Sequence, residues 1–282
     1  MLICLKTIGD TVATSPASPA NMGGAIDSTL TPVGPIFIDH NETIGEDETN
    51  VNVLDQEEDL ELVTHTGVDL SVRANTVVVA VSHGFTDNLD LSLVMPIVQE
   101  HIDVTTTGAL VGHTQVTFAG ASDLAVRLKY RLLPWLSALL KATFPTGNPS
   151  EGLGTGEYFL TPGLAASQIF GPVQLNALLQ FNVDLSYARK SSISYGVGAA
   201  TQLYWPWLGV AFEFLGESGG SPDPLLILGT DYAQNQTYIL AFGLRAVLPH
   251  DFMLFAAGSY ALSRGGLRSR DVFPTVGVGG RF

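Results

Sequence analysis

The chain has 282 residues, of which 46% are hydrophobic and only 14% are charged, which is an unusually apolar balance for a water-soluble protein of this length. Its net charge of −14 argues against a nucleic-acid partner, because the sequence offers no basic stretch to neutralise phosphates. The single cysteine, Cys4, excludes an intrachain disulfide. Apolar runs stop near ten residues, which is too short for a membrane helix but is the length of a membrane-spanning β-strand.

Residues 1–35 are rich in Ala, Ser, Pro, Thr and Gly, and they predict an irregular leader or linker. The opening "MLICL" is too short for the apolar core of a secretory signal, so in an exported protein the signal peptide would be absent or truncated in this chain. An acidic segment, residues 39–69, opens the remaining domain, 36–282. We interpret its charges as a solvated run, with collection of divalent cations as the alternative.

From there the sequence alternates between apolar and polar residues, which predicts β-strands. We expect about twelve strands, near 49–55, 69–83, 88–104, 121–133, 135–146, 157–170, 173–187, 192–205, 207–217, 236–248, 251–262 and 274–282.

The connections between these segments alternate in length. Tight connections lie around 84–88, 133–134, 170–172, 205–207 and 248–251, and longer polar or Gly-rich ones lie around 56–68, 105–120, 147–156, 218–235 and 263–273. Only 187–192 departs from the rule, because it is short but polar. Short periplasmic turns and long outer loops are typical of bacterial outer-membrane barrels.

The segment 173–187 shows which way the apolar face looks. Leu175, Leu179 and Phe181 lie on one side, Gln180 and other polar residues lie on the opposite side, and Leu178 is the exception. In a soluble barrel the apolar side would point inward, but twelve such strands would enclose a wide apolar cavity that nothing fills. We therefore predict an all-β fold, a transmembrane antiparallel up-and-down β-barrel in the bacterial outer membrane, with its apolar face toward lipid.

The polar face of these strands is then predicted to line the lumen. Arg127, Lys129 and Arg131 form a basic stripe that either favours anions or braces the barrel by pairing with Asp123, Asp184 or Glu213. The predicted lumen-lining residues are Asp90, Asp123, Arg127, Lys129, Arg131, Lys141, Gln174, Asn176, Gln180, Asn182, Asp184, Gln202, Glu213, Arg245 and Arg281.

The chain ends in "TVGVGGRF", with Val276, Val278 and Phe282 on one face of the last expected strand. A final strand with a terminal aromatic predicts that Phe282 is an assembly signal. The expected partners are therefore outer-membrane lipid and lipopolysaccharide, the outer-membrane assembly machinery, and a small-molecule solute.

Several stretches together resemble a known family. They are "FIDHNETIGE", "HGFTDNLDLSLVMPIV", "GASDLAVRLKYRLL", the run "KATFPTGNPSEGLGTGEYFLTPGLAASQIFGPVQLNALLQFNV" and the terminal Phe282. Over residues 36–282 the chain is similar to the outer-membrane transporters grouped as the MetA pathway of phenol degradation. The resemblance implies an outer-membrane barrel for uptake of hydrophobic or aromatic compounds.

The sequence offers no pattern that predicts catalysis, a cofactor or a metal. "GLGTG" at 152–156 lacks the Lys-Ser/Thr of a phosphate-binding loop and reads as a flexible outer loop. The histidines show no ligand spacing. Ser82 and His83 point to opposite faces of a strand, which leaves Ser92 and His101 as the remaining candidates for a nucleophile and a base.

We therefore interpret the chain as a non-enzymatic channel for passive uptake of small, hydrophobic or aromatic solutes. The alternatives are a non-transporting barrel that serves as an adhesin or envelope-structural protein and, less favoured, a barrel hydrolase. Residues 1 to about 48 are expected to lie off the barrel wall and to enter or cover its periplasmic mouth; a free linker is the alternative.

Overall fold

The computed structural model describes residues 37–63, 68–106, 112–151, 153–186, 191–219, 236–264, 268–269 and 272–282. Its elements are β1 (Thr49–Val63), β2 (Val68–Thr86), β3 (Leu89–Thr106), β4 (Gly112–Ala121), β5 (Leu124–Leu133), β6 (Leu136–Phe144), a short 3-10 turn (Pro149–Glu151), β7 (Phe159–Phe170), β8 (Val173–Asp184), β9 (Ser192–Gln202), β10 (Leu208–Gly219), β11 (Gln236–Leu248), β12 (Phe252–Arg264), β13 (Arg268–Ser269) and β14 (Phe273–Arg281).

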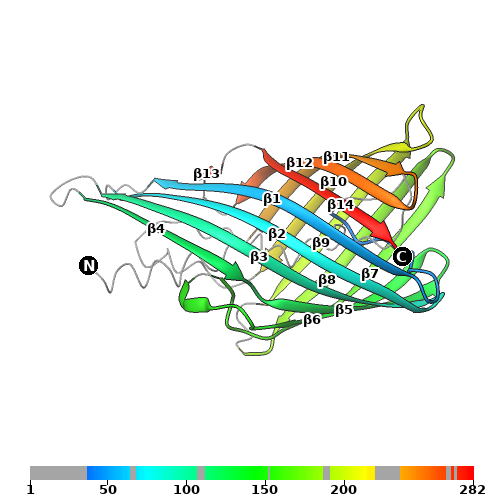
Figure 1. The fold of residues 1–282 in the computed structure, drawn as a ribbon, viewed down its shortest axis with the longest axis horizontal. Helices are drawn as coiled ribbons and strands as arrows, with labels where there is room; N and C mark the ends of the chain where they lie inside the picture. Colours follow the sequence, from blue (N-terminus) through cyan, green and yellow to red (C-terminus); the bar gives the residue numbers. More distant parts are fainter. Residues whose placement is uncertain are drawn as a thin grey trace.

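These strands form one closed antiparallel sheet (Figure 1). Consecutive strands pair along the chain, and β1 pairs with both β2 and β14, which closes the ring. β4 and β5 both pair with β3 on either side of a break at Ser122 and Asp123, so they act as one wall strand. With β13 counted together with β14, the 14 strands make a wall of twelve, and the predicted fold is confirmed.

Two of the predicted outer loops are wrong. β1 continues to Val63 and β2 begins at Val68, where a loop was expected at 56–68. β3 continues to Thr106 and pairs with β4, where a loop was expected at 105–120. These strands extend past the rest of the barrel (Figure 1). Acidic residues crowd positions 57–61, and small or polar residues dominate 105–115, so the alternation that marks a strand is weak in both stretches.

Other predicted connections fall partly outside the described residues. These include 187–190 of the polar turn, 220–235 of the loop before β11, and 265–267 with 270–271 of the loop before β14. Among the residues that the structure describes, no helix is long and apolar enough to cross a membrane.

Side-chain exposure along β8 shows the orientation of the wall. Leu175, Leu179 and Phe181 expose 39–46% of their surface, whereas the alternating residues Gln180 and Asn182 expose only 3% and 6%. The apolar side chains therefore face outward and the polar ones face the barrel interior, which is the arrangement that a lipid environment favours.

The two ends of the wall meet at the end of the barrel that carries the tight turns, which we call the turn end. The Thr49 amide donates to the Phe282 carbonyl (3.0 Å), and the Phe282 amide donates to the Thr49 carbonyl (2.8 Å). Exposed Trp205 and Trp207 stack there with ring centroids 6.0 Å apart, in the turn between β9 and β10. In outer-membrane barrels of known orientation, the short turns are the periplasmic ones.

Candidate functional site in the barrel lumen

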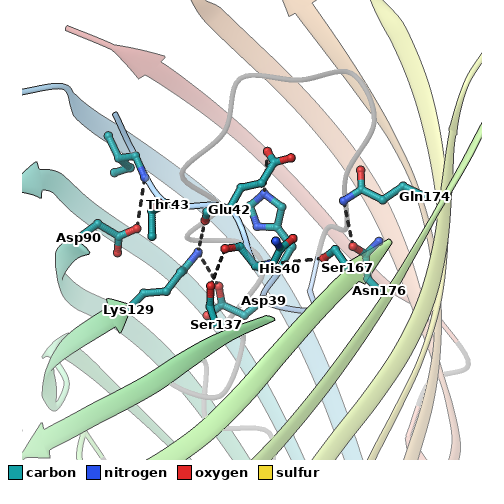
Figure 2. A network of polar contacts seen from close by, with 12 residues as sticks. Asp39, His40, Glu42, Thr43, Asp90, Lys129, Ser137, Ser167, Gln174 and Asn176 are labelled. Atoms are coloured by element: carbon teal, nitrogen blue, oxygen red, sulfur yellow. Dashed lines mark hydrogen bonds and ion pairs between the residues drawn. The ribbon is translucent and has the colours of Figure 1, made fainter. Parts of the chain in front are cut away.

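The residues just before β1 run inside the barrel; we call residues 37–48 the inner segment (Figure 2). Its first residues, from Phe37 to Asn41, expose no more than 3% of their surface. At its other end Asp47 donates from its amide to the Gly84 carbonyl (2.9 Å), and Thr49 then joins the wall at the turn end. The inner segment therefore occupies the lumen from its turn end. Residues 1–36 lie outside the described residues, so the boundary between leader and barrel domain stays a prediction.

An ion-pair cluster joins the inner segment to β5. Asp39 Oδ2 accepts a hydrogen bond from Arg127 Nη1 (2.5 Å), and Lys129 Nζ lies 3.1 Å from Asp39 Oδ1. All three side chains are buried. Burial alone would raise the pKa of Asp39, but the charges of Arg127 and Lys129 outweigh it and hold this pKa below its usual range. Asp39 is therefore a carboxylate that neutralises two buried cations.

The wall also satisfies backbone groups of the inner segment, which no secondary structure would otherwise pair. Glu213 Oε2 accepts the amides of Phe37 (2.8 Å) and Ile38 (3.1 Å). Lys129 Nζ donates to the Glu42 carbonyl (2.9 Å), and Asp90 Oδ2 accepts the amide of Ile44 (3.3 Å). These contacts fix the course of the inner segment by its backbone rather than by its side chains alone.

Asn41 is held between neighbouring strands. Its carbonyl accepts from Ser137 Oγ (2.5 Å) on β6, and its amide donates to Ser167 Oγ (3.3 Å) on β7. Its side-chain amide donates to the Pro134 carbonyl (2.6 Å) in the turn between β5 and β6. Figure 2 shows Asp90, Lys129, Ser137 and Ser167 pointing from the surrounding wall toward the inner segment.

Apolar side chains of the inner segment have their own partners on the wall. Ile38 packs in a buried cluster with Leu139, Ala165 and Leu178. Leu178 is the residue that interrupts the alternation of β8, and its contact explains the interruption: it points inward because Ile38 fills the space before it. A Cβ atom at Gly196 would lie only 3.1 Å from Ile38 Cγ1, so the wall is also hollowed at this point.

Most of the predicted lumen-lining side chains are buried in the barrel. Arg131 and Arg281 are partly exposed at the turn end, and Gln202 is exposed because it is the last residue of β9, beside a turn. Arg131 bonds Asn88 Oδ1 and the Asp87 carbonyl, and Arg281 pairs with Glu48 and Asp251. The buried ones are Asp90, Asp123, Arg127, Lys129, Lys141, Gln174, Asn176, Gln180, Asn182, Asp184, Glu213 and Arg245.

Asp123 serves the outer end of the barrel rather than the basic stripe. Its carboxylate accepts the amides of Gly147 (3.1 Å) and Thr155 (2.7 Å) and the Thr155 hydroxyl (2.7 Å). Buried Leu153 packs against Gly120 nearby. The Gly-rich stretch was expected to be a flexible loop, but in its described residues one carboxylate anchors it on both sides.

A pocket of about 660 Å³ opens at the turn end beside the inner segment. Glu42 and Thr43 line it from the inner segment, Arg131 lines it from the end of β5, and Asn88 and Pro134 line it from the adjoining turns. Solvent at the turn end therefore reaches the inner segment directly.

The remaining candidates for a nucleophile and a base do not meet. Ser92 is buried and its Oγ accepts hydrogen bonds from Ser82 Oγ and Arg127 Nη2, whereas His101 is exposed and bonds Thr117 Oγ1 (2.8 Å). Within the described parts of the chain, no group of three or more His, Cys, Asp or Glu side chains is arranged to hold a metal ion.

Sequence reasoning did not single out Asp39. It offered Asp123, Asp184 and Glu213 as partners of the basic stripe, whereas the structure pairs Arg127 and Lys129 with Asp39, which lies 88 residues from Arg127. The one available signal was charge: residues between Thr7 and Val72 include many acids and no Lys or Arg.

Comparisons with known proteins agree with the fold. An outer-membrane channel from Pseudomonas putida aligns over 86% of this chain and 98% of its own, at 17% identity and a TM-score of 0.62. The translocator domain of the autotransporter NalP from Neisseria meningitidis aligns over 86% and 91% (12% identity, TM-score 0.51). The toluene transporter TbuX from Ralstonia pickettii aligns over 85% and 90% (11% identity, TM-score 0.50).

No protein-family model matches the chain, and its sequence matches no curated protein. The chain has the fold of outer-membrane β-barrels, with the inner segment held in the lumen.

Proposed function

We propose that this protein is an outer-membrane channel for passive uptake of small hydrophobic or aromatic solutes, closed in the present state by its inner segment. We also propose that it belongs to the MetA-pathway family of phenol degradation and acts in the bacterial outer membrane without catalysis. The toluene transporter with a similar barrel and the quoted motifs support the choice of solute class.

The observation that carries the proposal is that the lumen is occupied by a segment that is not part of the wall. A barrel that serves only as a structural element can fill its interior with wall side chains. Here, instead, inward-facing serines, carboxylates and cations of the wall bind the irregular backbone of the inner segment at Ile38, Asn41 and Glu42. Such an arrangement closes a pore without removing it.

Conductance in planar bilayers tests this proposal. The full chain should show small or intermittent currents, whereas a variant that lacks residues 1–44 should show a larger and steadier current, because the lumen is then empty. A variant that lacks only residues 1–35 is the matched control, since it retains the whole inner segment. If the 1–44 deletion inserts into bilayers and carries no current, the barrel is an adhesin or an envelope-structural protein and the channel function is wrong.

A further inference from the structure

We propose that the lumen binds small organic anions that combine an apolar ring with a carboxylate, and that Phe37 and Asp39 occupy the two halves of this binding site in the closed channel. The inference rests on the proposed function and names its substrate class. The inner segment would then act as an internal competitor of the solute.

The first half of the site is built for a carboxylate. Each oxygen of Asp39 meets a different cation, Arg127 Nη1 at 2.5 Å and Lys129 Nζ at 3.1 Å. Both cations are buried, and Ser92 Oγ accepts from Arg127 Nη2 (3.0 Å), which fixes the guanidinium. Charge-assisted hydrogen bonds of this kind are the strong ones, so a carboxylate is the chemical group that this half selects.

The second half is built for a ring. Phe37 belongs to a buried apolar cluster whose wall members include many small side chains, which leave room for its aromatic ring. These small members are Ala80, Ala125, Ala200, Ala211 and Ala241. Because the cluster lies inside the barrel, its apolar surface is sheltered from lipid and is available only to what enters the lumen.

β5 contributes residues to both halves. Ala125 of the apolar cluster, Arg127 and Lys129 occupy successive inward positions of this strand. Phe37 and Asp39 are likewise two residues apart in the inner segment. A solute that carries a ring next to a carboxylate therefore presents the same two groups in the same order.

Exchange between solute and segment also avoids an electrostatic cost. Arg127 and Lys129 are buried, so the lumen is more stable when an anion lies beside them. Asp39 supplies that anion in the closed state, and the carboxylate of the solute would supply it in the occupied state. A neutral aromatic compound could not take over this role.

Opening of the full chain by matched solutes tests the inference. Benzoate carries both groups, benzyl alcohol has the ring without the charge, and acetate has the charge without the ring. Benzoate should raise the open probability at roughly ten- to hundredfold lower concentration than either of the others, which is the range for one charge-assisted contact. Lys129→Gln, which leaves the Arg127–Asp39 pair in place, should reduce the difference in potency between benzoate and the other two solutes.

Arg131→Gln is the matched control, because Arg131 lies on the same strand but bonds Asn88 and the Asp87 carbonyl instead of Asp39. In this variant benzoate should remain more potent than benzyl alcohol and acetate by the same factor as in the wild type. Equal potency of the three solutes overturns the inference, as does a full chain that benzoate leaves closed, provided that the 1–44 deletion conducts; in both cases the channel function stands. A deletion variant that inserts but does not conduct overturns the channel function and the inference together.

Discussion

Arg127 and Lys129 place two positive charges in the interior of the barrel, where each is costly without a counter-charge. Both pair with the same carboxylate, Asp39, which lies on a segment that is not part of the wall. The closed state of the lumen therefore depends on Asp39 more than on any one hydrogen bond of the inner segment.

Asp39→Asn should open the channel. Breaking a buried ion pair by removing one partner costs about 3–5 kcal/mol, and the segment avoids this cost by leaving the lumen so that water reaches the two cations. The measurement is the open probability in bilayers. Glu42→Gln is the control, because it neutralises a neighbouring acid whose contact with Lys129 is made by the backbone carbonyl and survives; similar opening by both variants would refute the role of Asp39.

Acid should open the channel as well. The pKa of Asp39 is lowered in the folded state, because the nearby cations outweigh the effect of burial. A carboxyl with a lowered pKa contributes stability that is fully present above its unfolded pKa, roughly 4, and is lost as the pH falls through its folded pKa. Open probability should therefore be constant from neutral pH to about 4 and rise below that in the wild type, but stay flat in Asp39→Asn.

Leu179→Arg tests the lipid-facing side of the wall. An arginine near the bilayer midplane costs a transmembrane barrel about 2–4 kcal/mol, falling to about 0–1 kcal/mol near the interface. Tyr204→Arg is the interfacial control, because Tyr204 is 93% exposed in a turn at the turn end. Equal losses in urea unfolding from lipid vesicles would contradict the orientation of β8.

At the scale of single residues, the sequence predicted whether a side chain points into or out of the barrel, but not which group it contacts. The period of two places Arg127 inward and Val126 outward from local pattern alone. The Asp39–Arg127 contact joins residues 88 positions apart and depends on the path of a segment without periodicity. Local sequence pattern cannot predict a contact of this kind.

Among the elements, β8 shows why an imperfect pattern is informative. Its alternation is regular except at Leu178, which faces inward and packs against Ile38. The exception at Leu178 therefore indicates that another part of the chain packs there, since an apolar residue on the inward, polar face is stable when an apolar group covers it.

Leu178→Gln should loosen the inner segment although it makes the alternation of β8 complete. It replaces the buried partner of Ile38 with a polar side chain that has no bonding partner assigned there, at a cost of about 1–3 kcal/mol. A cysteine introduced by His40→Cys in a Cys4→Ser background should then react faster with a water-soluble maleimide. Leu175→Gln, on the lipid face, should leave this rate unchanged; equal acceleration would contradict the packing.

The strands β1 to β4 mark the limit of prediction at the element scale. Most of β2 and β3 was located from the sequence, whereas the outer half of β1 and nearly all of β4 were taken for loops. The outer backbone is held by pairing with neighbouring strands over long registers, such as Glu61 with Ser71 and Asp103 with Gln115. Such pairing is made by the backbone, so it leaves no signature in side-chain hydrophobicity where the alternation is weak.

For the whole molecule, deletion of residues 1–44 should leave the barrel folded, because every wall strand begins at or after Thr49. The heat-modified shift in gel mobility and the β signal in circular dichroism should match those of the full chain. Loss of folding would show that the inner segment is needed to build the wall, and not only to close it.

The attachment of the inner segment to the seam between β1 and β14 sets a scale for its competition with solutes. Its 12 residues, 37–48, can span at most about 40 Å when fully extended, so a released segment stays tethered within reach of the turn end. A ligand on so short a tether has an effective concentration in the millimolar range. A free solute displaces the segment only when its concentration exceeds this effective concentration divided by the ratio of the two affinities, that of the solute over that of the segment. In the proposed channel, the length of the tether would thus set a threshold: the pore would stay shut to traces of solute and open when the solute is abundant.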